Sequence, residues 1–281
     1  MHPLLIAAIA VFATVLVLFA IWLFLIAPKP RKEAVRPFLR PYAHRGLWGE
    51  GVPENSLAAF DRAAAEGFAI ELDVQLAADG TVMVFHDYTL DRMCGREGKL
   101  AELTAAELNT ISLGGTNETI PTFRQVLDTV AGRVPLLIEL KGENGNVDLV
   151  PRTLALLRDY EGEWCMESFN PLLLREVKKQ DGRVVRGLLS TNHIKSRREG
   201  SKLLNFVLSA LLLTFLARPA FHAFDGRYPH GLGLRVGLRL FGAAPVVYTI
   251  RDEEAYNRYL DAGIAPIFEG FIPARREVTL K

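Results

Sequence analysis

Two pairs of charged residues follow apolar runs and have the spacing of a shared strand face. Glu71 and Asp73 lie in IELDV, and Glu139 and Lys141 lie in LLIELK. Side chains two positions apart on a strand point to the same face, so each pair presents its charges together. Two like carboxylates on one face repel each other unless a cation neutralises them, and hard divalent cations prefer oxygen ligands. The spacing therefore predicts a divalent metal site.

Two histidines and an arginine accompany these carboxylates. His44 and Arg45 lie in YAHRG, Glu54 follows in PEN, and His86 lies in VFHD. Imidazoles titrate near neutral pH and suit proton transfer, whereas Arg45 and Lys141 carry the positive charge that a phosphate needs. Each feature alone also fits a capped turn, an exposed strand face or a strand-end ion pair. Their combination at successive strand ends favours a catalytic site.

The second carboxylate strand continues into a predicted hairpin. AADG, within IELDVQLAADGTVMVFHD, has the residues of a tight turn. A turn centred between residues 78 and 79 pairs Glu71 with His86 and Asp73 with Val84. The returning strand then lies outside the main sheet and brings His86 to Glu71.

Segments of strand and helix type alternate along the rest of the chain. Strands are expected at 42–44, 68–74, 135–140, 164–169, 184–189, 221–224, 246–250 and 266–268, and helices at 56–66, 122–130, 150–160, 171–179 and 252–260. Ser56 and Asp252 are the expected N-caps of two of these helices. The alternation fits a doubly wound sheet or a (β/α)8 TIM barrel, and eight strands favour the barrel, over residues 41–281 with a small hairpin insertion after its second strand. The candidate residues fall at strand ends, where barrel active sites form.

The first 28 residues contain an uncharged apolar run, 4–27. At ~1.5 Å per residue, a helix of this length crosses a hydrocarbon core of ~30 Å. A signal sequence fits less well, because no basic segment precedes the run and no clear cleavage motif follows it. We expect a single-pass transmembrane helix in the cell membrane. Basic residues after the run, in a linker at 29–40, predict that the barrel faces the cytoplasm.

A second apolar segment, 203–217, lies within an insertion at about 194–220. It is too short to span a bilayer comfortably, and the basic residues Lys195, Arg197, Arg198 and Lys202 precede it. It is either a buried barrel helix or a helix that lies in the membrane interface. With a formal net charge of +1, we expect a lipid bilayer but no nucleic acid as a partner. Cys94 and Cys165 form no motif, in keeping with a reducing compartment.

In this order and at these spacings, AHRG, PEN, IELDVQ, VFHD and IELK resemble the glycerophosphodiester phosphodiesterases, with looser likeness in SFNP, FHAFD and VVYTI. The resemblance spans about residues 40 to 275. It implies a TIM barrel that uses Ca²⁺ or Mg²⁺ to hydrolyse glycerophosphodiesters to glycerol 3-phosphate and an alcohol. It assigns the metal to Glu71, Asp73, Glu139 and, as a further ligand, Glu54; acid–base catalysis to His44 and His86; and the phosphate to Arg45, with Lys141 close by.

Two positions depart from the family pattern. Tyr248 stands where a tryptophan is usual and can stack on the glycerol or the leaving group. Glu269 stands in Phe268-Glu269-Gly270, where the family usually has Thr-Asp. We expect both departures to affect substrate choice more than the reaction.

Several alternatives remain at this stage. A membrane location favours lysophospholipids as substrates, cleaved to lysophosphatidic acid. A barrel like the phosphatidylinositol phospholipases also pairs two histidines, but the full metal set and PEN argue against it. A non-catalytic membrane protein on the same barrel predicts the loss of a histidine or carboxylate, and none is lost. The nucleophile is either water or a neighbouring hydroxyl of the substrate.

Overall fold

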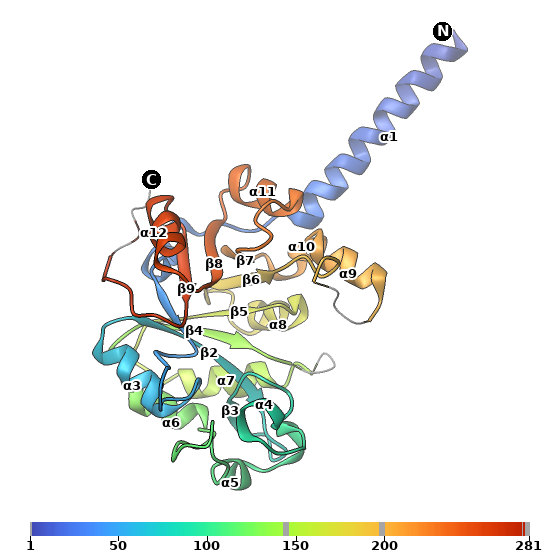
Figure 1. Ribbon diagram of the computed structural model, residues 1–281. Coiled ribbons are helices and arrows are strands. Elements are labelled where there is room, and N and C mark those ends of the chain that lie inside the picture. The colour runs from blue at the N-terminus through green and yellow to red at the C-terminus, as the bar shows by residue number, and fades with distance from the viewer. Residues whose placement is uncertain (1, 143–145, 197–199, 277, 279–281) are drawn as a thin grey trace.

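A closed barrel of parallel strands forms the body of the protein (Figure 1). The computed structural model describes residues 2–142, 146–196, 200–276 and 278. Within these ranges the barrel strands, in order around the barrel, are β1 (Tyr42–His44), β2 (Ala69–Leu76), β4 (Leu136–Leu140), β5 (Trp164–Ser168), β6 (Arg186–Ser190), β7 (Phe221–Asp225), β8 (Ala244–Ile250) and β9 (Ala265–Phe268). Parallel pairing of β1 with both β2 and β9 closes the ring. The predicted TIM barrel is confirmed, and each of the eight expected strands overlaps a barrel strand.

Helices cover the outside of the barrel and the loops between its strands. In the described part of the chain they are α1 (Pro3–Ile26), α2 (Lys32–Val35), α3 (Leu57–Ala65), α4 (Asp91–Cys94), α5 (Ala105–Leu108), α6 (Phe123–Val130), α7 (Leu149–Leu157), α8 (Pro171–Gln180), α9 (Lys202–Ser209), α10 (Thr214–Ala217), α11 (Leu232–Arg239) and α12 (Glu253–Asp261), with short 3₁₀ turns η1 (Arg36–Phe38) and η2 (Leu100–Glu102). The two expected N-caps are confirmed. The side chains of Ser56 and Asp252 accept the amides of Ala59 and Ala255 at 3.1 and 2.7 Å.

The alternation of side chains along β2 directs its carboxylates into the barrel. Ile70, Leu72 and Val74 belong to the outer core, where α3 and α6 contribute Phe60 and Phe123. The alternate residues of the strand therefore face the interior of the barrel. The helices thus cover one face of β2, and its acidic face turns toward the barrel axis.

The hairpin after β2 forms, but its predicted register is wrong by one residue. β3 (Val82–Val84) pairs antiparallel to β2 with Val74 opposite Val84, so Val84 does not face Asp73. The Ala77 amide donates to the Thr81 carbonyl at 2.9 Å and Gly80 has a φ of +78°, which gives an odd-numbered loop centred on Asp79. Such a loop, with a left-handed glycine in its last position, shifts the register by one residue relative to a two-residue turn.

The chain after α1 packs against the barrel, although residues 29–40 were expected to form a linker. α2 and η1 bury Val35 and Phe38 in a cluster with residues from the first positions of the strands, among them Tyr42 and Phe221. The Tyr42 hydroxyl also donates to the Phe38 carbonyl at 2.8 Å. This segment closes the amino-terminal end of the barrel, opposite the end that carries the predicted site residues.

α1 projects away from the barrel and has an exposed apolar surface along most of its length (Figure 1). It has 24 residues and a mean hydropathy of 3.1 over its most apolar stretch, none of which is buried. By length and composition it is able to cross a membrane. Signal sequences share these properties.

The apolar segment 203–217 forms two short helices instead of one. α9 and α10 are separated by a turn in which Leu211 has a φ of +59°. Thr214 and Ala217 of α10 are fully buried, whereas Leu203 and Phe206 of α9 are 72% and 52% exposed. The buried interpretation therefore fits α10, and α9 is an exposed apolar helix. Arg197 and Arg198, expected to precede this segment, lie outside the described residues.

Candidate active site

Three carboxylates converge inside the barrel at the carboxyl ends of β2 and β4. One oxygen from each of Glu71, Asp73 and Glu139 lies within 4.8 Å of the others, and all three residues are buried. The parallel register places Asp73 directly beside Glu139. Burial and the charges of Asp73 and Glu139 raise the pKa of Glu71 well above its usual range. The group therefore needs positive charge to ionise fully.

Two basic side chains supply part of that charge. Lys141 Nζ lies 3.2 Å from Asp73 Oδ1 and 3.0 Å from Glu139 Oε1. The backbone amide of Arg45 donates to Glu71 Oε2 at 3.0 Å, and Arg45 Nε lies 3.5 Å from Asp73 Oδ2. Burial would raise the pKa of Asp73, but the charges of Lys141, His86 and Arg45 hold it well below its usual range.

The donor set fits a hard divalent cation. Among the described residues, three carboxylates face the two cations Arg45 and Lys141, which leaves a negative charge. Buried Asp73 Oδ1 has the Lys141 ammonium 3.2 Å away as an ion-pair partner but accepts no well-aligned hydrogen bond from any described residue. Clustered carboxylate oxygens are the ligands that Ca²⁺ and Mg²⁺ prefer. Glu71, Asp73 and Glu139 are the residues able to hold such an ion.

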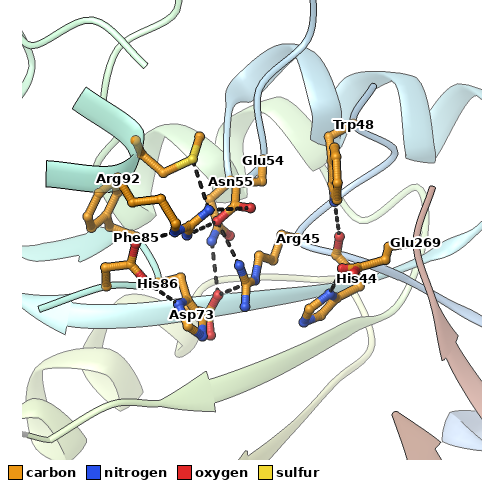
Figure 2. Close-up of polar contacts among 12 residues, drawn as sticks. His44, Arg45, Trp48, Glu54, Asn55, Asp73, Phe85, His86, Arg92 and Glu269 are labelled. Atoms are coloured by element: carbon orange, nitrogen blue, oxygen red, sulfur yellow. Dashed lines mark hydrogen bonds and ion pairs between the residues drawn. The ribbon is translucent and has the colours of Figure 1, made fainter. Parts of the chain in front are cut away.

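His44 connects this cluster to a carboxylate on the last strand loop. Its Nδ1 is hydrogen-bonded to Glu269 Oε2 (Figure 2). Its Nε2 lies 3.8 Å from Glu71 Oε2. Burial would raise the pKa of Glu269, but His44 and Arg251, whose Nη2 lies 2.6 Å from Glu269 Oε1, hold it at about 2. Glu269 is therefore ionised and accepts the bond, so Nδ1 is the donor. Nε2 is left facing the acidic cluster.

A carboxylate also binds Nδ1 of His86. Its Nδ1 lies 2.6 Å from Asp87 Oδ1, and Asp87 Oδ2 accepts from Arg92 Nε at 2.6 Å. Burial would raise the pKa of Asp87, but His86 and Arg92 hold it well below its usual range. Burial raises the pKa of Glu139 against the opposing charges of Lys141 and His86, and His86 acts with Lys141 to lower the pKa of Asp73 against the effect of its burial. His86 therefore acts on Asp73 and Glu139, and the predicted pairing with Glu71 is not what brings it to the site.

Glu54, the predicted further metal ligand, lies in a chain of ion pairs. Its carboxylate accepts from Arg45 Nη1 at 2.7 Å and from Arg92 Nη2 at 2.5 Å (Figure 2). The group of three carboxylates described above does not include it. Glu54 thus joins the arginine beside Asp73 to the arginine behind His86.

Two turns with left-handed backbone hold the polar groups around Asp73. Arg45 and Asn55 have φ values of +59° and +55°, a conformation that costs non-glycine residues energy. The Asn55 amide nitrogen donates to the Arg45 carbonyl, and Asn55 Nδ2 donates to Asp73 Oδ2, both at 2.9 Å. At Gly46, with φ of +82°, a Cβ would lie 2.8 Å from the Ala59 carbonyl carbon, so only glycine fits there.

The hydroxyl of Tyr248 is hydrogen-bonded within the barrel. The hydroxyl donates to the Ser190 carbonyl at 2.8 Å, and the ring meets Phe169 edge-on with centroids 5.9 Å apart. These two contacts hold the Tyr248 side chain against Ser190 of β6 and Phe169, which directly follows β5. Stacking on a substrate remains a prediction for this residue.

Three members of the network were missed as functional residues by the sequence analysis. Glu269 was expected to affect substrate choice more than the reaction, which stays a prediction, and its direct contact with His44 was not anticipated. A carboxylate just after the last strand of a barrel was the available signal. For Asp87, the signal was its place directly after His86 in VFHD, whereas Arg92 carries no signal of its own in the sequence.

A cavity of about 700 Å³ opens beside the site. Glu139 and Lys141 line one part of it. Polar residues, among them Ser168, Asn170 and Thr191, line another part. A wall of apolar side chains includes Phe169 of the β5 loop and Leu204, Leu208 and Leu213 of the α9–α10 insertion. The cavity therefore joins a charged end to an apolar wall.

The architecture defines a class, the TIM-barrel proteins, whose sites lie at this end of the barrel. Within that class the chain belongs to the glycerophosphoryl diester phosphodiesterase family, whose sequence model matches residues 44–272. A glycerophosphodiester phosphodiesterase of Caldanaerobacter subterraneus is 35% identical over 159 residues, which are 52% of this chain and 65% of the relative. Glycerophosphodiester phosphodiesterase 1 of Bos taurus is 29% identical, over 59% of this chain and 55% of the relative. Each match thus spans less than two thirds of the relative's length.

Solved structures share the fold. A glycerophosphodiester phosphodiesterase of Thermotoga maritima has a TM-score of 0.62 at 26% identity, covering 82% of this chain and 94% of that one. A phosphodiesterase of Oleispira antarctica, solved with the product sn-glycerol-3-phosphate, has a TM-score of 0.67 at 23% identity, covering 82% and 92%. The barrel of this chain is therefore the family's barrel.

Proposed function

We propose that this chain is a metal-dependent phosphodiesterase that hydrolyses glycerophosphodiesters to glycerol 3-phosphate and an alcohol. The observation that carries the proposal is the convergence of three buried carboxylates and two carboxylate-bound histidines at one end of the barrel. Membership in the glycerophosphoryl diester phosphodiesterase family supports the same activity.

His44 and His86 transfer the protons in this proposal. Each ring is bound through Nδ1 to a carboxylate, which orients the imidazole and leaves Nε2 free for proton transfer. One imidazole takes a proton from the attacking hydroxyl, and the other gives a proton to the departing alkoxide. Tyr248 provides a surface for the glycerol or the leaving group.

Positive charge around the phosphate stabilises the negative charge of the phosphodiester during the reaction. Arg45 and Lys141 neutralise the phosphodiester, and Glu54 positions Arg45 through their 2.7 Å contact. A divalent cation, Ca²⁺ or Mg²⁺, held by Glu71, Asp73 and Glu139, would supply further positive charge as a Lewis acid.

Release of glycerol 3-phosphate from glycerophosphocholine tests the proposal. The full-length chain in detergent should release it with Ca²⁺ or Mg²⁺ and not in EDTA. His44→Ala and His86→Ala should each lower kcat by roughly 10²- to 10⁴-fold. His230→Ala, at an exposed position in the loop before α11, is the matched control and should leave kcat unchanged.

Two outcomes would contradict the proposal. A rate close to that of the unchanged chain in either histidine variant would remove that histidine from the mechanism. Lack of turnover on a panel of glycerophosphodiesters, with metal binding demonstrated, would refute the activity itself.

Lysophospholipids are a second substrate class, favoured by one observation. The cavity beside Glu139 and Lys141 has an apolar wall from α9, which suits a single acyl chain. Cleavage would then yield lysophosphatidic acid and the headgroup alcohol. Leu208→Glu should lower kcat/KM for lysophosphatidylcholine and leave that for glycerophosphocholine unchanged. An equal effect on both substrates would exclude the acyl chain from this wall.

We further propose that α1 anchors the protein in the cell membrane with the barrel on the cytoplasmic side. The length and hydropathy of α1 support anchoring, and the basic residues after it support the orientation. The intact mass of the membrane-extracted protein tests the anchor, since cleavage of a signal sequence would remove α1. Protease digestion of sealed inside-out and right-side-out vesicles tests the orientation.

A further inference from the structure

Two short helices outside the catalytic site expose large apolar side chains. On α9, Leu203 and Phe206 are 72% and 52% exposed. At the two ends of α11, Leu232 and the C-cap residue Leu240 are 67% and 66% exposed. Single exposed leucines are common in soluble proteins, but three leucines and a phenylalanine on two adjoining helices form an apolar surface of the kind that binds a partner.

The two helices adjoin each other and the base of α1. Gly233 of α11 packs so closely on the end of α9 that a Cβ there would lie 2.6 Å from the Ala210 carbonyl oxygen. α10, which follows α9, contacts α1 through the rings of Phe215 and Phe24, with centroids 5.6 Å apart. In Figure 1, α10 and α11 lie at the base of α1, and α9 extends from α10. The exposed leucines thus adjoin the point at which α1 leaves the barrel.

Positive charge gathers at the same place. Arg218 Nη1 donates to the Ala27 carbonyl at the end of α1, at 2.8 Å, and its guanidinium lies 4.7 Å from the Phe24 ring centroid. Burial and several neighbouring cations, Arg186, Arg218, Arg175 and Lys29, lower the pKa of Lys178. On α11, Arg235 and Arg239 are exposed between the two leucines. The exposed Arg235 and Arg239 and the half-buried Arg218 thus give this surface a positive charge, which favours an anionic partner.

We propose that the exposed faces of α9 and α11 lie in the interface of an anionic bilayer and seat the barrel on the membrane from which α1 emerges. This inference rests on the proposal that α1 is a membrane anchor. The leucines and Phe206 enter the boundary between headgroups and acyl chains, and the arginines contact anionic headgroups. α9 also lines the active-site cavity through Leu204 and Leu208, so the mouth of that cavity lies at the membrane surface.

Quenching of fluorescence by lipid acyl chains tests this arrangement. The full-length chain with Cys94→Ser carries a single new cysteine, labelled with a small fluorophore, and is reconstituted into vesicles of phosphatidylcholine and phosphatidylglycerol. The test positions are Phe206→Cys and Leu232→Cys. Ile272→Cys, at a 53% exposed residue after β9, is the matched control, and Val15→Cys reports on α1. Doxyl-labelled lipids are the quencher.

The proposal expects a large loss of fluorescence at Phe206→Cys and Leu232→Cys and little loss at Ile272→Cys. A loss at these two positions no greater than at Ile272→Cys overturns it. If Val15→Cys is quenched in that case, the anchor stands and only the seating of the barrel fails; if it is not quenched, both fail. Energy transfer between differently labelled copies, without lipid quenching, would identify a second copy as the occupant and also overturn it.

Lipid charge tests the role of the arginines. Quenching at Leu232→Cys should weaken when phosphatidylglycerol is omitted or salt is raised, because screening reduces attraction to anionic headgroups. Arg235→Gln with Arg239→Gln should remove this dependence. Quenching that is indifferent to lipid charge would overturn the anionic part of the proposal.

Discussion

Removal of the Lys141 ammonium should destabilise the metal-free protein strongly. The Lys141 side chain is 11% exposed, and its ammonium lies 3.2 and 3.0 Å from the carboxylates of Asp73 and Glu139. Loss of one partner from a buried ion pair costs about 3–5 kcal/mol, because the remaining charges stay buried without compensation. At roughly 2–4 °C per kcal/mol for a domain of about this size, Lys141→Met should lower Tm by roughly 6 to 20 °C.

The loss should depend on pH in a defined direction. Without Lys141, Asp73 and Glu139 bind protons more readily in the folded state, which relieves the repulsion between them. The difference in Tm between Lys141→Met and the unchanged chain should therefore be larger at pH 8 than at pH 5.

Thermal melts of the full-length chain in detergent and EDTA provide the assay. Lys179→Met is the matched control, because Lys179 is 76% exposed and its contact with Glu176 is 3.6 Å. Ca²⁺ or Mg²⁺ should raise Tm more for Lys141→Met than for the unchanged chain, since the variant presents a more negative site. If Lys141→Met melts within about 2 °C of Lys179→Met in EDTA, the reasoning that Lys141 offsets buried carboxylates is refuted.

Three further predictions follow from the described contacts. Glu269→Gln should lower kcat roughly 10²-fold or more and change its pH profile while preserving Tm, because His44 loses an ionised partner on Nδ1; an unchanged profile would limit Glu269 to a structural role. Burial lowers the pKa of His222 to about 4, so the unfolded state binds more protons between pH 4 and 6.5, and stability should fall by about 2 kcal/mol from pH 7 to pH 5. His222→Leu should remove this loss, as measured by urea unfolding at both pH values. Burial raises the pKa of Cys94 to about 11 and Cys165 is buried, so both thiols should react slowly with a disulfide reagent at pH 8 unless the chain is denatured.

The sequence by itself determined the barrel and the convergence of its acidic residues. Apolar runs separated by helical segments predict parallel strands, and the spacing of Glu71 and Asp73 predicts a shared face whatever the surrounding structure. Glu139 joins them because parallel strands bring their carboxyl ends to the same end of a barrel. These are local or topological properties, which a periodic pattern reveals.

Only the tertiary structure decided how the histidines are supported. His44 and Glu269 are 225 positions apart and meet because β1 and β9 are neighbours in the closed ring. The hairpin register depended on one left-handed glycine, Gly80, which the composition of the turn allowed but did not require.

The tertiary structure also decided the division of the apolar segment 203–217. Both halves of the run are apolar, but α10 packs against α8 and α1, whereas the outer face of α9 meets solvent. Burial depends on what other segments bring to each face, and that is a property of the assembled chain. The sequence therefore predicted an apolar helix, and the packing around it determined which part is left exposed.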